Sequence, residues 1–79
     1  MKDDTVIFCS NLKSLRESLG LSQKEMAQRL EVSQPCLETM EGGILPPEVD
    51  VGILFLIYDQ FGIPPSRMFE EHAKRSTQH

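Results

Sequence analysis

The 79-residue chain contains no tryptophan, one tyrosine and two cysteines, and it carries fewer basic than acidic residues. Two cysteines do not make a disulfide framework, and the lack of any CxxC spacing argues against zinc and thioredoxin-like motifs. Cys9 and Cys36 are therefore expected to be reduced thiols of a cytoplasmic protein. The formal charge is −4, whereas nucleic-acid binders usually carry a basic surplus. This balance counts against a generic polyanion binder but leaves room for a local basic face.

Long apolar runs are also lacking. The run at 6–8 is too short for a signal peptide and follows two aspartates, and the run at 51–58 is too short to span a bilayer. His72 and His79 lie in a polar stretch without a partner at ligand spacing, so we expect no metal site and no cofactor. With no Ser–His or Cys–His pair, no Gly-rich phosphate loop and no carboxylate pair in a recognisable cleft, we expect no enzyme.

The apolar spacing instead predicts five helices and no strand. A stripe from Phe8 to Leu19 marks the first helix, with Thr5 as its expected N-cap. Pro46-Pro47 is expected to open a fourth helix that runs to about residue 61, and Pro64-Pro65-Ser66 a short last turn. The expected organisation is an N-terminal arm at 1–7, a folded domain at 8–69 and a polar, disordered tail at 70–79.

The second and third helices have the clearest start signals. Ser22-Gln23-Lys24-Glu25 is a capping box, in which the Ser22 hydroxyl accepts the N–H of Glu25 and the Glu25 side chain reaches back. Ser33 is expected to cap the next helix, and Pro35 falls in its first turn, where a missing N–H costs nothing. Gly42-Gly43 can end that helix in a left-handed conformation. Two short helices joined by so tight a turn are typical of a helix-turn-helix.

Residues 21–34, LSQKEMAQRLEVSQ, resemble the LSQ-x-E-LA-x-x-x-GVS-x motif of the phage repressor and Cro family, also called XRE-like. Residues 37–43 resemble the end of that family's recognition helix, and Phe61-Gly62-Ile63 resembles its LGV. The resemblance covers roughly residues 8–69 and implies an all-α, five-helix, lambda-repressor-like DNA-binding fold. Glu31 stands where the family usually has a glycine with positive φ, a conformation that costs Glu about 1 kcal/mol.

The resemblance implies that the third helix, 34–41, enters the major groove of double-stranded DNA. The matching base-reading positions are Gln34, Pro35 and Thr39, with Glu38 nearby. Gln34 suits the task, because a carboxamide can accept from adenine N6 and donate to N7, whereas Pro35 offers only its ring to a thymine methyl. The phosphate contacts expected from the match and from helix-start geometry are Ser22, Gln23, Lys24, Ser33 and Gly43.

Positive charge is scarce around these positions. Between residues 20 and 43, Lys24 and Arg29 stand against four glutamates, a net charge of −2. Because phosphate contacts supply most of the affinity, one domain should bind weakly and two half-sites would be needed. The resemblance also implies a salt bridge between Arg16 and Glu41, with two unrelated surface charges as the alternative.

The fourth helix is apolar nearly all round, whereas a surface helix needs only one apolar stripe. By family match Val51 and Tyr58 face the core, while Ile53 and Leu56 fall where the family is commonly polar and lie on one face. Such a patch indicates a homodimer interface. The alternative is a monomer whose apolar N-terminal arm covers that face.

The sequence therefore favours a cytoplasmic transcriptional regulator, of the repressor type, that binds DNA as a homodimer without a small-molecule ligand. The alternative is a protein-binding regulator on the same fold, such as an antirepressor or a partner subunit with weak or no DNA binding. The acidic third helix and the apolar fourth helix favour that alternative. The two hypotheses differ in whether Lys13, Lys24 and Arg29 share the face that presents Gln34.

Overall fold

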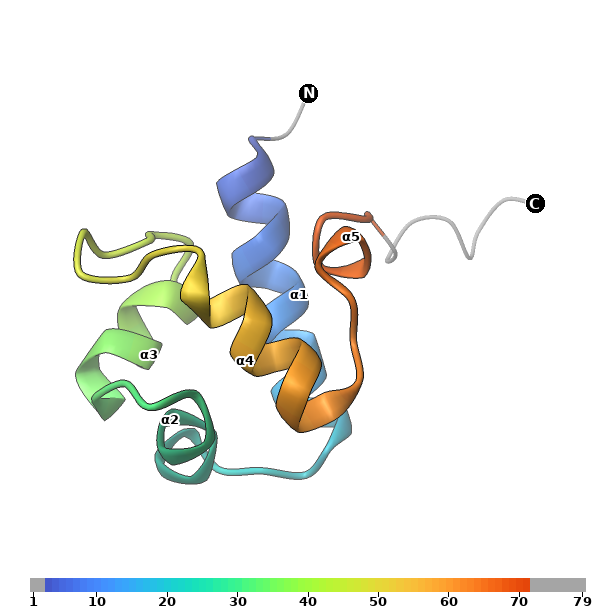
Figure 1. Ribbon diagram of the computed structural model, residues 1–79. Helices are drawn as coiled ribbons and strands as arrows, with labels where there is room; N and C mark the ends of the chain where they lie inside the picture. Colours follow the sequence, from blue (N-terminus) through green and yellow to red (C-terminus); the bar gives the residue numbers. More distant parts are fainter. Residues whose placement is uncertain (1–2, 72–79) are drawn as a thin grey trace.

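The computed structural model describes residues 3–71, which form five α-helices and no strand. In Figure 1, α3 and α5 lie on opposite sides of α4, α1 runs behind it, and α2 lies below. The predicted all-α class with five helices is confirmed. The helices are α1 (Asp4–Ser18), α2 (Gln23–Leu30), α3 (Gln34–Glu41), α4 (Gly52–Phe61) and α5 (Pro65–Met68).

The core lies where the apolar faces of α1 to α5 meet. The apolar residues at helical spacing on α2 and α3 are buried, among them Met26, Leu30 and Leu37. Leu19 is 45% exposed, because α1 ends at Ser18 and Leu19 is its C-cap, so the apolar stripe of α1 is shorter than predicted. The side chains that are almost completely enclosed are Cys9, Leu12, Met26, Leu30, Leu37, Met40 and Ile57.

The first helix begins earlier than the sequence pattern predicts. Asp3 is its N-cap, and the Asp3 carboxylate accepts the backbone N–H of Thr5 at 3.3 Å. Aspartate caps helices well, and its charge favours the helix N-terminus. Residues 4–7 therefore belong to α1 instead of a separate arm, and Ile7 is buried. Residues 1–2 and most of the predicted tail, 72–79, lie outside the described residues.

The fourth helix begins later, at Gly52 instead of Pro46-Pro47. The N–H of Val49 donates to the Pro46 carbonyl, which makes a single turn. That turn does not continue, because the Asp50 carboxylate accepts the N–H of Gly52 at 2.9 Å. Aspartate commonly competes with helix formation through such a local bond. Residues 42–51 consequently form a loop between α3 and α4 (Figure 1).

A buried asparagine joins the end of the domain to its first helix. The Asn11 carboxamide nitrogen donates to the carbonyls of Met68 and Glu70, each at 2.7 Å. One turn earlier on α1, the ring of Phe8 stacks on that of Phe69 with centroids 5.7 Å apart. These contacts hold α5 against α1.

The turn between α2 and α3 contains a left-handed glutamate. Glu31 is the C-cap of α2 with φ 60° and ψ 39°, and within residues 3–71 no other residue apart from glycine has a positive φ. The expectation from the glycine at the matching family position is confirmed. The left-handed region brings Cβ close to the following carbonyl oxygen, so a β-carbon is disfavoured here.

Replacing Glu31 with glycine should therefore stabilise the domain. We expect Glu31→Gly to raise the free energy of unfolding by about 1 kcal/mol. Gln28→Gly, in the exposed body of α2, is the matched control and should lower it by about the same amount. Urea denaturation measures both, and equal losses in the two variants would contradict the assignment of strain to Glu31.

Candidate nucleic-acid interface

Two serines fix the starts of the two helices of the helix-turn-helix. The Ser22 hydroxyl accepts the N–H of Glu25 at 3.0 Å, and the Glu25 carboxylate accepts the N–H of Ser22 at 2.8 Å. The predicted capping box is thus present. The Ser33 hydroxyl accepts the N–H of Cys36 at 3.2 Å. Each hydroxyl keeps its own O–H as a donor, and both serines are exposed.

The four candidate base-reading residues share the exposed side of α3. Positions 34, 35, 38 and 39 follow helical spacing and are all exposed, whereas Cys36, Leu37 and Met40 are buried on the opposite side. Figure 1 shows α3 at the margin of the molecule, so this side meets solvent. The structure therefore brings Gln34, Pro35, Glu38 and Thr39 onto a single surface.

That surface offers hydrogen-bonding groups without positive charge. The Gln34 carboxamide donates to the Glu38 carboxylate at 3.2 Å. The Thr39 hydroxyl donates to the Pro35 carbonyl at 3.0 Å. Gln34 keeps its carbonyl oxygen and one N–H, and Glu38 keeps acceptor capacity. The remaining groups match base edges better than phosphates.

A bidentate ion pair sets the position of α3. Arg16 Nε lies 2.6 Å from Glu41 Oε2, and Arg16 Nη2 donates to Glu41 Oε1 at 3.0 Å. Arg16 Nη1 also donates to the carbonyl of Leu21 at 2.9 Å, and Gln23 donates to Glu41 Oε1 at 3.0 Å. The salt bridge that the resemblance implies is present. It joins α1, the start of α2 and the end of α3.

This network removes one glutamate from the surface charge of α3. Burial raises the pKa of Glu41, but hydrogen bonds from Arg16 and Gln23 and the charges of Arg16 and Lys13 outweigh burial and hold it below its usual value. The hydrogen bond to Glu41 in turn raises the pKa of Arg16. The Glu41 side chain is only 4% exposed. Glu38 is thus the carboxylate that α3 presents to solvent.

The candidate phosphate contacts form a thinner set than predicted. The N–H of Gly43 donates to the Met40 carbonyl at 2.9 Å, so the expected backbone donor at Gly43 is already used in the helix end. Gln23 is half-buried, and one of its two side-chain N–H groups is committed to Glu41. Lys24 is exposed on the first turn of α2. The hydroxyls of Ser22 and Ser33, the second side-chain N–H of Gln23 and the Lys24 ammonium remain.

The two basic residues of α2 do not share a face. Lys24 and Arg29 lie five residues apart on α2, which places them about 140° apart around the helix. Arg29 acts on Glu25, whose pKa is lowered first by the capping bonds with Ser22 and last by Arg29. Lys13, on α1, acts on Glu41. Strong phosphate binding is favoured when basic side chains lie on one surface, and Lys24 and Arg29 do not.

The cysteines contribute packing. Cys9 and Cys36 are both buried, and burial is the first cause that raises the pKa of each thiol. A thiolate is therefore disfavoured at either position. Within residues 3–71, no group of three or more His, Cys, Asp or Glu side chains is arranged to hold a metal ion. None of the helices described is long and apolar enough to cross a membrane.

The exposed apolar residues of α4 differ from those that the sequence indicated. Ile53 is 7% exposed and belongs to the core, and half-buried Leu56 packs against it, so this pair does not form an exposed patch. Val51, Phe55 and Tyr58 are instead 69%, 66% and 56% exposed. They recur at i, i+4 and i+7 and form one stripe, the α4 apolar stripe. The family match placed Val51 and Tyr58 in the core, which is wrong, since the structure buries Ile53 and Ile57 on that side of α4 instead.

The sequence model of a family described as a helix-turn-helix domain matches residues 10–56, more than half of the chain. The chain belongs to this helix-turn-helix family. The matched segment contains the ion pair, the capping box, the left-handed turn and the exposed side of α3. The resemblance that residues 21–34 carry is thereby confirmed at the level of the family.

This helix-turn-helix domain is also similar to a longer curated protein. A protein of Cereibacter sphaeroides named "Propionyl-CoA carboxylase regulator" is 33% identical over 66 residues. The aligned segment covers 84% of this chain but only 14% of that relative. The chain thus spans a small part of the length of the protein it matches. No solved structure matches the chain with significance.

The ion pair makes stability depend on pH. Because the pKa of Glu41 lies below its usual 4.5, the stability that this carboxylate contributes is present above that pH and is lost as pH falls below it. We expect Glu41→Gln to lower the free energy of unfolding by about 2 kcal/mol at pH 7, since it leaves Arg16 without its charged partner. The deficit should shrink as pH falls from about 5 to about 3.

Urea denaturation across this pH series gives the measurement. Glu38→Gln, an exposed position on the same helix, is the matched control and should change stability by less than about 0.5 kcal/mol. A Glu41→Gln deficit that stays constant with pH would show that the lost stability does not come from the ionised carboxylate.

Proposed function

We propose that this domain is a DNA-binding transcriptional regulator that places the exposed side of α3 in the major groove. The observation that carries the proposal is the common exposure of Gln34, Pro35, Glu38 and Thr39 on a helix that an ion pair holds in place. A rigidly held recognition surface loses little entropy on binding. The regulator name of the similar Cereibacter sphaeroides protein supports a regulatory role, and we propose that this role is carried out in the cytoplasm.

Base recognition would rest on four different chemistries. Gln34 can read adenine through its carbonyl oxygen and its remaining N–H. Glu38 can accept from cytosine N4, and the Pro35 ring can contact a thymine methyl. The Thr39 hydroxyl can serve as donor or acceptor. The hydrogen bond from Gln34 to Glu38 holds the two side chains beside each other, which supports their acting on neighbouring base pairs.

Phosphate binding would be weak in a single copy. The available donors are the hydroxyls of Ser22 and Ser33, the Gln23 side chain, the Lys24 ammonium and the backbone N–H groups that begin α2. Only Lys24 among these carries charge, so the salt dependence contributed by one domain should be shallow. Useful affinity then requires two half-sites about one helical turn of DNA apart.

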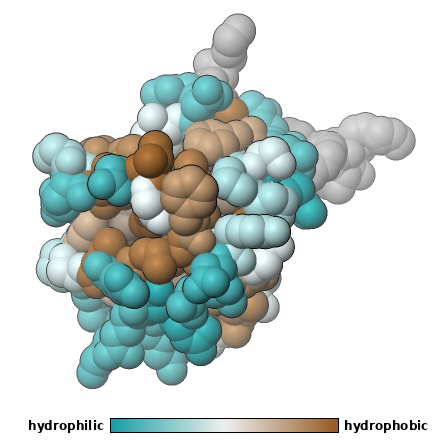
Figure 2. All heavy atoms as spheres, viewed as in Figure 1, coloured by the Kyte–Doolittle hydropathy of each residue, from teal (hydrophilic) through white to brown (hydrophobic). Residues whose placement is uncertain are grey.

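Homodimerisation would supply the second half-site, and the α4 apolar stripe supports it. Val51, Phe55 and Tyr58 are exposed along one side of α4, and Figure 2 shows apolar surface gathered over α4 and the loop before it. Exposed contiguous apolar surface commonly marks an interface. A two-fold dimer through one patch on each copy would pair two α3 surfaces.

The DNA proposal is tested by selecting bound sequences from a random duplex library at low salt. The expected pool contains a repeated half-site, and Gln34→Ala should weaken binding to the selected duplex by about tenfold or more. Gln60→Ala, exposed on α4, is the control and should bind as wild type does. A pool without enrichment from folded protein would contradict DNA reading.

Sedimentation velocity tests the dimer. We expect a dimer at tens of micromolar and a monomer for Phe55→Ser, because Phe55 is the centre of the stripe and its loss leaves the core intact. Gln60→Ser serves as the control on the same helix. A wild-type protein that is monomeric at that concentration would rule out the stripe as a homodimer interface.

The alternative function is a protein-binding regulator on the same fold. The divergence of Lys24 and Arg29 and the exposed Glu38 carboxylate support it, since both reduce attraction to phosphate. An unenriched DNA pool together with retained dimerisation or partner binding would favour this alternative.

A further inference from the structure

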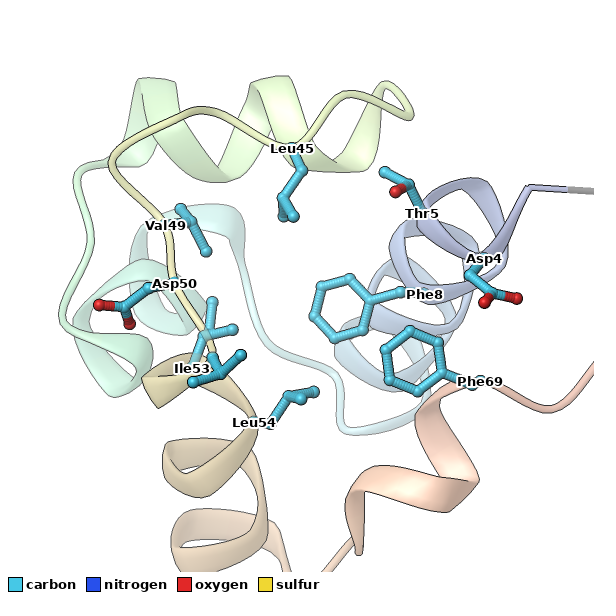
Figure 3. A pocket seen from close by; sticks show the side chains of 10 residues that line it. Asp4, Thr5, Phe8, Leu45, Val49, Asp50, Ile53, Leu54 and Phe69 are labelled. Atoms are coloured by element: carbon cyan, nitrogen blue, oxygen red, sulfur yellow. The ribbon is translucent and has the colours of Figure 1, made fainter.

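A pocket opens between the start of α1, the loop before α4, the start of α4 and the residue after α5. Its volume is about 290 Å³, which lies at the lower end of the range for small-molecule sites and leaves room for one or two inserted side chains. Figure 3 shows Phe8, Leu45 and Leu54 pointing into the pocket from three different segments. Most of its lining is apolar and also includes Val49, Val51, Ile53 and Phe69, of which Val51 is shared with the α4 apolar stripe.

The charged residues at this pocket are all acidic. Asp4 and Asp50 belong to its lining, and Figure 3 places them on opposite sides of the pocket with their carboxylates directed outward. None of the ten lining residues is Lys or Arg. One Asp50 oxygen accepts the N–H of Gly52, which leaves the other oxygen for a further partner. Asp3 and Glu48 adjoin the lining in the chain and are exposed.

The combination of an apolar pocket and neighbouring acidic residues limits which molecules could bind there. A phosphate backbone would be repelled by the two carboxylates. A second copy, docked through the same patch, would bring its own Asp4 and Asp50 to the same rim, and like charges so placed oppose association. Positive charge on either side of an apolar side chain complements both features.

We propose that this pocket is a docking site for a basic amphipathic helical segment of another protein. One or two large apolar side chains of that segment enter between Phe8, Leu45 and Leu54, and Lys or Arg residues on either side meet Asp4 and Asp50. The proposal is independent of DNA reading by α3, because the pocket contains none of the candidate DNA contacts.

The test is a selection of helix-forming 16-residue peptides, displayed on phage from a random library, against the full chain. The expected pool carries apolar residues at i and i+3 or i+4 with Lys or Arg near both. A fluorescent peptide made from the pool is then titrated against wild type and variants by fluorescence polarisation. Leu45→Ser should weaken its binding about tenfold, and Asp50→Asn, which keeps a side-chain acceptor for Gly52, about threefold.

Matched controls separate this site from the other surfaces. Ile44→Ser and Asp59→Asn change an exposed apolar and an exposed acidic residue outside the pocket, and both should bind as wild type does. Phe55→Ser should also bind normally, because Phe55 lies in the part of the α4 apolar stripe that does not line the pocket, whereas Val51 belongs to both surfaces. Circular dichroism confirms that each variant is folded.

Three outcomes would overturn the proposal. One is a pool of neutral or acidic peptides, or no peptide whose binding Leu45→Ser weakens more than Ile44→Ser does. Another is an affinity that added salt leaves unchanged, since contacts to exposed carboxylates are screened. The third is self-association that Leu45→Ser abolishes, which would make a second copy the occupant.

Discussion

The pair of charged hydrogen bonds between Arg16 and Glu41 is the contact on which the arrangement of the first three helices depends. The same guanidinium donates to the Leu21 carbonyl, and the same carboxylate accepts from Gln23. Four residues thereby connect the end of α1, the start of α2 and the end of α3. Breaking the pair would leave a charge with little access to water, which is far costlier than losing an exposed ion pair. The orientation of α3 is therefore strongly determined.

The ion pair also determines which charged groups remain available beside the exposed side of α3. The network neutralises Glu41, but it also commits the arginine closest to the end of α3. The exposed side of α3 then has hydrogen-bonding groups without a cation, and Lys24 and Arg29 point in different directions on α2. Recognition by such a surface would rely on base edges and on a second copy of the domain more than on phosphate attraction.

Sequence patterns located the features that depend on neighbouring residues. The capping box from Ser22 to Glu25 is a local pattern, whereas the left-handed Glu31 at the turn was expected from the glycine at the matching family position. The salt bridge came from the family resemblance, because no local rule joins residues 25 positions apart. These features fix the helix-turn-helix, which is why the family and the all-α class could be predicted.

The predictions for the fourth helix were wrong because one side chain there changes the course of the backbone. The Asp50 carboxylate accepts the N–H of Gly52, and α4 begins six residues after Pro46. Ile53 then turns inward, while Phe55 lies in solvent. The apolar pocket escaped prediction for a related reason, because its walls come from segments that are distant in the chain.

The pocket and the exposed side of α3 give the domain two surfaces of opposite chemical preference. One is apolar with acidic residues at its opening, and the other presents hydrogen-bonding groups suited to base edges. They lie on different elements, so a partner at the pocket and DNA at α3 do not require the same residues. A regulator built this way can combine a nucleic-acid contact with a protein contact.

The reading of DNA by α3 can be tested by NMR amide chemical-shift mapping, with a selected DNA duplex titrated into labelled protein. We expect the largest shifts on residues 34–39 and on the start of α2, and little change in the amides of residues 45–54. Shifts centred on 45–54, or saturating binding that leaves 34–39 unperturbed, would contradict the assignment of DNA reading to α3.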